Sequence, residues 1–159
     1  MLDTPGLPPL TDQFSQAYWD AAREGTLLIQ RCAACGRYQF YPRGHCVQCS
    51  APDPEWAPAS GRGRLHTYTV VRRTPNAEFA ADCPYVLAII ELDEGPRITA
   101  RITGDADGLA CDQRVHVVFT PVGPPGGAGD AGVLPNFALD RGSDPYLPGP
   151  RHSRRPTAR

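Results

Sequence analysis

The sequence predicts a mainly β protein in which an N-terminal helix leads into a small ribbon organised by cysteines, then a five-stranded closed barrel and a disordered tail. Two C-x-x-C pairs, Cys32 with Cys35 and Cys46 with Cys49, are separated by ten residues and mark the ribbon. From residue 64 onward, short runs of β-branched and aromatic residues alternate with turn residues, which is typical of a small all-β domain. With 159 residues, the chain has room for one compact domain and a small module.

The cysteine spacing predicts a structural zinc site. A C-x-x-C turn directs both sulfurs toward one point, and a second such turn completes the tetrahedron of thiolates, with Cys32, Cys35, Cys46 and Cys49 as ligands. A disulfide framework requires an oxidising compartment, and a thioredoxin-like redox motif requires a βαβ unit; the sequence indicates neither. A catalytic zinc keeps an open coordination position, whereas four thiolates fill the shell. His45 directly precedes Cys46, but as a ligand it would break the symmetric spacing.

The segment from Thr11 to Glu24 predicts a helix that is capped by Thr11 or Asp12 and ended by Gly25. Its apolar residues at the spacing i, i+3, i+4 and i+7 form one face, which consists of Phe14, Ala17, Tyr18 and Ala21. This face either packs on the chain's own domain or, because the small ribbon offers little core, docks on another subunit. The candidate docking residues are Phe14, Tyr18 and Trp19.

The other predicted elements are short strands. Two of them, 27–31 and 38–41, carry the metal turns, and a stiff proline-rich connection follows. Five more strands are expected at 65–72, 85–93, 97–103, 114–120 and 133–139, and in this order they fit a closed barrel of the OB type. We therefore expect four parts: residues 1–26 with the docking helix, a zinc ribbon at 27–58, an OB-fold at 59–140 and a disordered Pro/Arg-rich tail at 141–159.

Charge and composition exclude several classes of function. The net charge is −1, so no global field attracts nucleic acid or an anionic membrane. All 16 basic residues are arginine, so the chain lacks a Schiff-base lysine, a pyridoxal-phosphate lysine and the lysine of a phosphate-binding P-loop. The N-terminal residues lack the basic start and apolar run of a secretory signal, and no apolar run is long enough to span a bilayer. We expect a cytoplasmic protein without a membrane partner.

The candidate binding residues outside the ribbon are arginines. We expect Arg72, Arg73, Arg97 and Arg101 to meet on one side of the barrel, near the loop between its first two strands. A solvated basic face is the simpler interpretation, and a site for the phosphates of a cofactor such as coenzyme A is the next. Single-stranded nucleic acid also requires stacking aromatic residues, of which this region has few. Because no side chain has an evident general-base partner, we assign no catalytic residue.

Six motifs in this chain occur together and in a characteristic order. They are W-D-A-A-R-E-G, the ribbon Q-R-C-A-A-C-G…F-Y-P-R…C-V-Q-C, A-S-G-R-G, Y-T-V-V, P-Y-V-L-A-I-I-E-L-D-E-G-P-R and L-P-N-F, within about residues 12 to 139. This set resembles the domain-of-unknown-function thirty-five family. The resemblance implies a rubredoxin-like zinc ribbon joined to an OB-fold, with zinc on the four cysteines. The chain departs from the family at Asp112-Gln113, where a glycine often precedes the fourth barrel strand.

The resemblance also implies a function. Members of the family are small partners of acyl-CoA enzymes, namely thiolase-like proteins, thiolase-fold aldolases of steroid side-chain breakdown and hot-dog-fold enoyl-CoA hydratases, and the catalytic groups generally lie in the partner. We therefore expect a non-catalytic subunit of a thiolase-like or aldolase complex in lipid or steroid catabolism, which helps assembly and coenzyme A binding. A hydratase partner is the alternative. A single-stranded nucleic-acid-binding module is a hypothesis from a different class, because OB-folds and zinc ribbons also serve that purpose.

Overall fold

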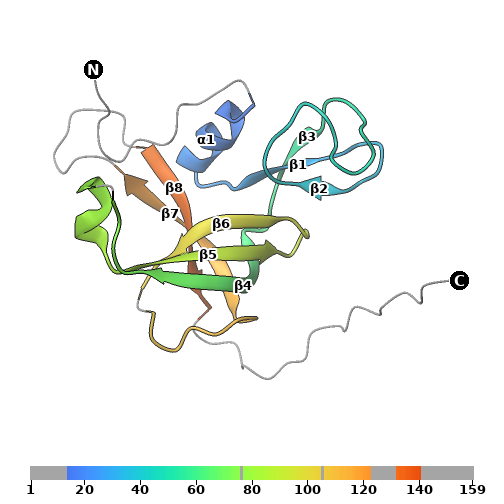
Figure 1. Ribbon diagram of the computed structural model, residues 1–159. Helices are drawn as coiled ribbons and strands as arrows, with labels where there is room; N and C mark the ends of the chain where they lie inside the picture. Colours follow the sequence, from blue (N-terminus) through green and yellow to red (C-terminus); the bar gives the residue numbers. More distant parts are fainter. Residues whose placement is uncertain (1–13, 76, 105, 123–131, 141–159) are drawn as a thin grey trace, which may run out of the picture.

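The computed structural model describes residues 14–75, 77–104, 106–122 and 132–140. Within these ranges the chain forms one α-helix, a three-stranded sheet and a closed five-stranded barrel, so the predicted fold class is confirmed. Figure 1 shows the small sheet at one end of the molecule, with the helix beside it and the barrel below. The predicted helix caps at Thr11 and Asp12 and the predicted tail at 141–159 lie outside the described residues.

Helix α1 spans Gln16–Arg23 and is therefore shorter than the predicted segment. It ends where expected, because Gly25 has a φ of 77°, in the left-handed region that glycine adopts at little cost. The amides of Gly25 and Thr26 donate to the carbonyls of Ala22 and Ala21, so the last turn leaves fewer carbonyl groups unpaired. Among the described residues, no helix has the length and hydrophobicity that crossing a membrane requires.

The small sheet has the strand order β2-β1-β3. Strands β1 (Leu28–Arg31) and β2 (Tyr38–Gln39) form the predicted hairpin. Strand β3 (Glu55–Pro58) lies in the segment that we expected to be a stiff proline-rich connection, and it pairs antiparallel with β1 along its whole length. Proline is tolerated there because β3 is an edge strand, where a missing N–H can face away from the sheet.

Five strands form the barrel, and all five were predicted with somewhat different ends. They are β4 (Arg62–Val71), β5 (Tyr85–Leu92), β6 (Arg97–Ile102), β7 (Arg114–Val122) and β8 (Gly132–Leu139). They close in the order β4-β5-β6-β8-β7, in which β6 and β8 are parallel and all other neighbours are antiparallel. A single 3-10 turn, η1 (Ala77–Asp82), occupies part of the predicted loop between β4 and β5.

One continuous apolar core joins the ribbon to the barrel. Leu27 and Ile29, at the start of the ribbon, belong to the same buried cluster as Leu65, Val115 and Phe137 of the barrel. Helix α1 packs between the two parts, because it contacts both β1 and β8. The expectation that the ribbon has little core to offer the helix was therefore wrong, since the ribbon shares the core of the barrel.

The buried face of α1 differs from the predicted one. Tyr18 and Ala22 are its buried residues, and Trp19 packs against the same cluster. Phe14 lies in the turn before the helix and is 44% exposed, so the helical period does not apply to it. The helix therefore packs on its own chain, which is the simpler of the two interpretations of its apolar face.

Glycine is required where the chain enters the barrel. A Cβ atom on Gly63 would lie 2.5 Å from the carbonyl oxygen of Glu91 on β5. A Cβ atom on Gly61, whose φ is 69°, would collide with a methyl group of Val117 on β7. The start of β4 approaches both neighbouring strands this closely only because these positions carry no side chain.

The turn before β7 is built without glycine. Asp112 has a φ of 69°, a conformation that glycine adopts freely and that aspartate tolerates better than most residues. The Asp112 amide donates to the Leu65 carbonyl at 2.7 Å, and the Arg64 guanidinium donates to the Asp112 carbonyl at 3.2 Å. The departure from the family pattern at Asp112-Gln113 therefore keeps a left-handed residue at this turn.

A bidentate ion pair connects the turn after β5 to β7. Arg114 donates from Nη1 and Nη2 to the two carboxylate oxygens of Asp93, at 2.6 Å and 2.7 Å. These hydrogen bonds and the charge of Arg114 lower the pKa of Asp93 below its ordinary value. The pair therefore favours the ionised carboxylate in the folded state.

We predict that Gly63→Ala destabilises the chain by about 1–3 kcal/mol, because the new Cβ must push β4 away from the Glu91 carbonyl. Gly44→Ala is the matched control, since its Cβ would meet only the Phe14 ring, at an ordinary 3.6 Å. Urea unfolding followed by circular dichroism measures both variants. Equal stability of the two variants would contradict the close approach of β4 and β5.

We predict a pH-dependent effect of Asp93→Asn. At neutral pH the variant loses less than about 1 kcal/mol, because the Asp93 side chain is 42% exposed and solvent screens the pair. The folded pKa of Asp93 is lowered, so the stabilisation is present above the unfolded pKa of about 3.9 and is lost as the pH falls through the folded value. Unfolding midpoints of both proteins from pH 7 to pH 2.5 test this; a difference independent of pH contradicts it.

Candidate metal centre

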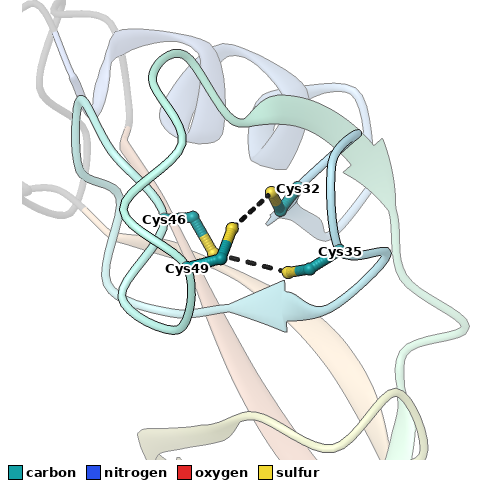
Figure 2. A group of neighbouring side chains, drawn as sticks. All are labelled: Cys32, Cys35, Cys46 and Cys49. Carbon is teal, nitrogen blue, oxygen red and sulfur yellow. Dashed lines mark hydrogen bonds between the residues drawn. The ribbon is translucent and has the colours of Figure 1, made fainter.

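Four cysteine side chains from two loops converge beside the small sheet. Cys32 and Cys35 lie between β1 and β2, and Cys46 and Cys49 lie between β2 and β3. The four sulfur atoms all lie within 4.8 Å of one another, with 3.6 Å from Cys32 Sγ to Cys49 Sγ and 3.7 Å from Cys35 Sγ to Cys46 Sγ. Figure 2 shows the four side chains pointing into the space between the loops. The structure thus brings together the four cysteines that the spacing selected.

This donor set suits a structural zinc ion. Zinc–sulfur bonds of about 2.3 Å in a tetrahedron place the sulfurs about 3.8 Å apart, close to the two separations above. A disulfide requires about 2.05 Å between sulfurs, and none of the six cysteines, all of which lie in the described residues, is in a disulfide. Soft sulfur donors favour zinc over ions that prefer oxygen. Because four thiolates fill a tetrahedral shell, such a site has a structural and not a catalytic character.

The two cysteine loops repeat one backbone geometry. In each loop, the residue after the second cysteine donates its amide to the carbonyl of the first cysteine, at 2.8 Å in one loop and 2.9 Å in the other. The amide of the first cysteine donates to the carbonyl of Arg37 or Ala51, at 2.8 Å in both. The first cysteine is buried and the second is exposed in both loops. The metal centre is therefore a pair of equivalent turns that face each other.

Each turn contains one residue in the left-handed conformation, directly after its second cysteine. These residues are Gly36, with a φ of 72°, and Ser50, with a φ of 59°. Glycine adopts this conformation without steric cost, as expected for Gly36, whereas a serine in it is strained by about 1 kcal/mol. The second turn is therefore the more strained of the two.

Hydrogen bonds and neighbouring thiols shift the acidity of the sulfurs in opposite directions. The backbone amides of Gln48 and Cys49 donate to the Cys46 sulfur and lower its pKa to about 6. The Ala51 amide also lowers the pKa of Cys49. The Cys32 thiol, burial and the other two thiols outweigh this effect and raise the pKa of Cys49 to about 12. One thiolate therefore opposes the ionisation of the next, and a divalent cation between them removes this opposition.

Two histidines, His45 and His116, lie in the ribbon and in the barrel. His45 is exposed and is not among the four converging ligands, which keeps the symmetric cysteine set. His116 on β7 has a carboxylate partner, since the Asp140 Oδ1 lies 2.6 Å from the His116 Nδ1. Asp140 follows β8, so the strand pattern around His116 does not indicate this partner. The pair connects the end of β8 to β7.

Sequence reasoning missed two buried glutamines beneath the second cysteine loop. Gln30 on β1 and Gln39 on β2 lie opposite each other, and each is only 5% exposed. Buried polar side chains in folded proteins are almost always hydrogen-bonded, and both of these contact the loop that leads to Cys46. Gln30 begins the ribbon motif Q-R-C-A-A-C-G, but neither glutamine is a metal ligand, so no ligand-spacing rule points to them.

The four predicted arginines do not assemble into one cluster. Arg97 begins β6 and forms an ion pair with Glu91 at 3.0 Å, whereas Arg101, near the other end, forms one with Asp82 at 2.9 Å. Four residues of extended strand separate the two arginines by about 13 Å along β6. Arg97 therefore lies toward the opposite end of β6 from Arg101.

The other three arginines lie toward one end of the barrel. Arg72 and Arg73 are exposed directly after β4, whose last residue, Val71, pairs with Tyr85. The Arg101 guanidinium lies over the Tyr85 ring, 4.0 Å from its centroid. Arg72, Arg73 and Arg101 are therefore all connected to the start of β5.

The predicted docking residues have different positions. Tyr18 is buried in the chain's own core and Trp19 packs against that core. The docking prediction was therefore wrong for Tyr18, because a core side chain presents no surface to a partner. Phe14 is exposed, so its role as a docking residue remains a prediction.

A ribbon of two cysteine turns joined to a closed five-stranded barrel defines a zinc ribbon with an OB-fold. A family model described as "ChsH2, rubredoxin-like zinc ribbon domain" matches residues 19–55, and one described as "ChsH2, C-terminal OB-fold domain" matches residues 56–120. A DUF35 domain-containing scaffold protein of Methanocaldococcus jannaschii is 35% identical over 128 residues, which are 79% of this chain and 88% of that protein. The chain belongs to the DUF35 family.

Other relatives carry names of acyl-CoA enzymes. A probable enoyl-CoA hydratase alpha subunit of Thermomonospora curvata is 37% identical over 91 residues, or 57% of this chain, and the chain spans only 28% of that protein's length. The benzoylsuccinyl-CoA thiolase subunit BbsA of Geobacter metallireducens is 27% identical over 92 residues, which are 58% of this chain and 60% of that protein.

A solved structure extends the likeness to the whole fold. A chain of the "Ltp2-ChsH2(DUF35) aldolase" is similar with a TM-score of 0.71 and 28% identity, and the match covers 83% of this chain and 98% of that chain. The ribbon and the barrel are thus arranged in a similar way in both proteins.

We predict opposite effects of substitutions at the two equivalent left-handed positions. Gly36→Ala costs about 1 kcal/mol through backbone strain alone, because no atom lies within 4 Å of the new Cβ. Ser50→Gly is neutral or slightly stabilising, since the strain that it relieves offsets the greater freedom of glycine in the unfolded chain. Urea unfolding of the zinc-loaded protein measures both; similar losses in the two variants would contradict the strain at Ser50.

Proposed function

We propose that the four cysteines bind a structural zinc ion and that this chain is a non-catalytic accessory subunit of a thiolase-like or aldolase complex. The complex acts on acyl-CoA thioesters, and lipid or steroid side-chain breakdown is the pathway that we propose. When bound, zinc supplies a cross-link between the two cysteine loops. The chain's own residues hold these loops in place and present a surface to the partner, in which the catalytic groups lie.

One observation carries the proposal of an aldolase or thiolase partner. It is the likeness, over nearly the whole of that chain, to the DUF35 component in the structure of the Ltp2-ChsH2(DUF35) aldolase. The relative named as a benzoylsuccinyl-CoA thiolase subunit supports the same class of partner. Both names describe assemblies with an enzyme, which agrees with a chain whose metal centre leaves no coordination position for a substrate.

An exposed apolar surface supports a docking role for the ribbon. Among the described residues there are four exposed large apolar side chains; Tyr41 and Val47 belong to the ribbon, Phe14 lies in the turn before α1, and Leu87 belongs to the barrel. The Phe14 ring lies over the loop that carries the two ribbon residues, since a Cβ on Gly44 would be 3.6 Å from its Cε1. Exposed aromatic and aliphatic groups are typical of protein interfaces. We propose Phe14, Tyr41 and Val47 as a contact surface for the partner subunit.

Coenzyme A binding is a separate part of the proposal. Arg72 and Arg73 are exposed at the end of β4, and a guanidinium group binds a phosphate through two parallel hydrogen bonds. Arg101 lies at the same end of the barrel, but Asp82 already engages its guanidinium. We therefore propose Arg72 and Arg73 as the principal contacts for coenzyme A phosphates, and not Arg97.

A hot-dog-fold enoyl-CoA hydratase subunit is the second candidate partner. The relative from Thermomonospora curvata, named a probable enoyl-CoA hydratase alpha subunit, favours it. In that case the role of this chain is the same, and only the fold of the partner differs.

Co-expression with a thiolase-like protein encoded beside this chain is expected to give a stable complex, while the chain alone turns over no acyl-CoA. Tyr41→Asp combined with Val47→Asp is expected to weaken the complex at least tenfold, because burying unpaired carboxylates in an interface is unfavourable. Leu87→Asp is the control, since Leu87 is an exposed apolar residue of the barrel. Co-purification and calorimetry measure binding. Failure to co-purify with any thiolase-like or hydratase neighbour contradicts the proposal.

Removal of one ligand tests the role of the metal. Cys35→Ser is expected to release zinc, unfold the ribbon and abolish the complex, because zinc binding in isolated zinc modules is worth about 10 kcal/mol. Cys111→Ser is the matched control, since Cys111 is exposed and lies outside the four-cysteine group. Zinc content by mass spectrometry and co-purification measure the two effects. A complex that stays intact without metal contradicts the structural role of zinc.

A further inference from the structure

The second cysteine loop lacks backbone ties to the rest of the ribbon. In the part of the chain that the structure describes, residues 43–53 form backbone–backbone hydrogen bonds only among themselves, such as Asp53 to Gly44 and Cys46 to Ala51. Strand β2, which precedes this loop, has only two residues. The position of Cys46 and Cys49 relative to Cys32 must therefore be set by other contacts.

Two glutamine side chains supply those contacts. Gln39 Oε1 accepts from the Val47 amide at 3.0 Å, and Gln39 Nε2 donates to the His45 carbonyl at 3.1 Å. Gln30 Oε1 accepts from the Arg43 amide at 2.8 Å, and Gln30 Nε2 donates to the Arg43 carbonyl at 3.1 Å. Gln39 Nε2 also donates to Gln30 Oε1 at 2.9 Å, which links the two side chains. The two glutamines, which face each other across β1 and β2, therefore bind the backbone of Arg43, His45 and Val47, which are alternate residues of the loop.

The backbone partners determine which atom each amide presents. The Val47 amide can only donate, so the atom of Gln39 that faces it is oxygen. The His45 carbonyl can only accept, so the atom of Gln39 that faces it carries hydrogen. A carboxylate of the same length supplies two acceptors and no donor, and an apolar side chain supplies neither. Both positions therefore demand an amide for chemical reasons and not for shape alone.

We infer that Gln30 and Gln39 are positioning residues for the metal centre. By holding residues 43–47 against the β1–β2 hairpin, they place the second cysteine turn opposite the first before a metal ion binds. This inference rests on the zinc site proposed above. Residues that orient metal ligands from outside the coordination sphere typically change metal affinity by 10–100-fold when they are altered. Their effect on affinity is expected because an ordered loop loses less conformational freedom on binding the ion.

Three variants of the full-length chain test the inference. Gln39→Glu keeps the shape and replaces the donor that faces both His45 and Gln30 by an oxygen, and it is expected to raise the Kd for zinc 10–100-fold. Gln30→Glu replaces one donor, toward Arg43, and is expected to have a smaller effect. Ala34→Glu adds the same charge at an exposed position of the first cysteine loop and is expected to stay within about threefold of the wild type.

Competition with a chromophoric chelator measures the Kd for zinc, and cobalt absorption spectra report whether four thiolates still coordinate a tetrahedral ion. Hydrogen exchange of the barrel amides separates a positioning role from general unfolding. The inference requires wild-type protection of the barrel together with weaker zinc binding in Gln39→Glu. Weaker binding accompanied by an equal loss of barrel protection overturns it.

The outcomes also separate this inference from the proposed metal site. If the wild-type chain binds no zinc, the metal site itself is wrong and the inference fails with it. If the wild type binds zinc and Gln39→Glu binds it equally well, only the positioning role is overturned. An equal loss in Ala34→Glu assigns the effect to charge and also overturns it. If Gln39→Glu does not fold, Gln30→Glu is judged by the same criteria.

Discussion

The sulfur atoms of four cysteines lie within 4.8 Å of one another, and the geometry of the ribbon follows from bringing them this close. Two turns with the same hydrogen bonds point their sulfurs at one space, which requires a left-handed residue after each second cysteine, at Gly36 and Ser50. The short strand β2 contributes little regular structure, so Gln30 and Gln39 connect the second turn to the hairpin. The buried side-chain amides of these two glutamines thus contact the loop that carries the second pair of sulfurs.

The ribbon is not an independent module, although its metal centre is local. Leu27 and Ile29 are buried in the same cluster as the barrel residues, and the Ala59 amide donates to the Leu27 carbonyl at 2.8 Å. Helix α1 covers this junction with Tyr18, whose burial raises its pKa above the ordinary range. The apolar core therefore fixes one side of the ribbon, while the cysteines and glutamines order the other side, where Tyr41 and Val47 are exposed.

The barrel strands and the two cysteine turns, which local patterns predict, are present in the structure, whereas the predicted apolar face of α1 is not its buried face. On β6, Ile98, Ala100 and Ile102 are buried in the core, because successive side chains of a strand point to opposite faces. Predictions that joined distant segments were less accurate. Strand β3 was missed because its pairing with β1 is non-local and its prolines indicate a loop. Arg97 and Arg101 lie toward different ends of β6, next to carboxylates from other segments that the strand pattern does not indicate.

The sequence by itself determined the four cysteines of the metal centre, the barrel strands and the family. Each of these depends on spacing or alternation within a short segment, which local geometry imposes. Only the tertiary structure decided that Tyr18 belongs to the core, that the ribbon shares that core, and that Gln30 and Gln39 bond the loop before Cys46. Those contacts depend on strand register and on the path of loops between elements. Side chains far apart in the chain meet only when both are in place.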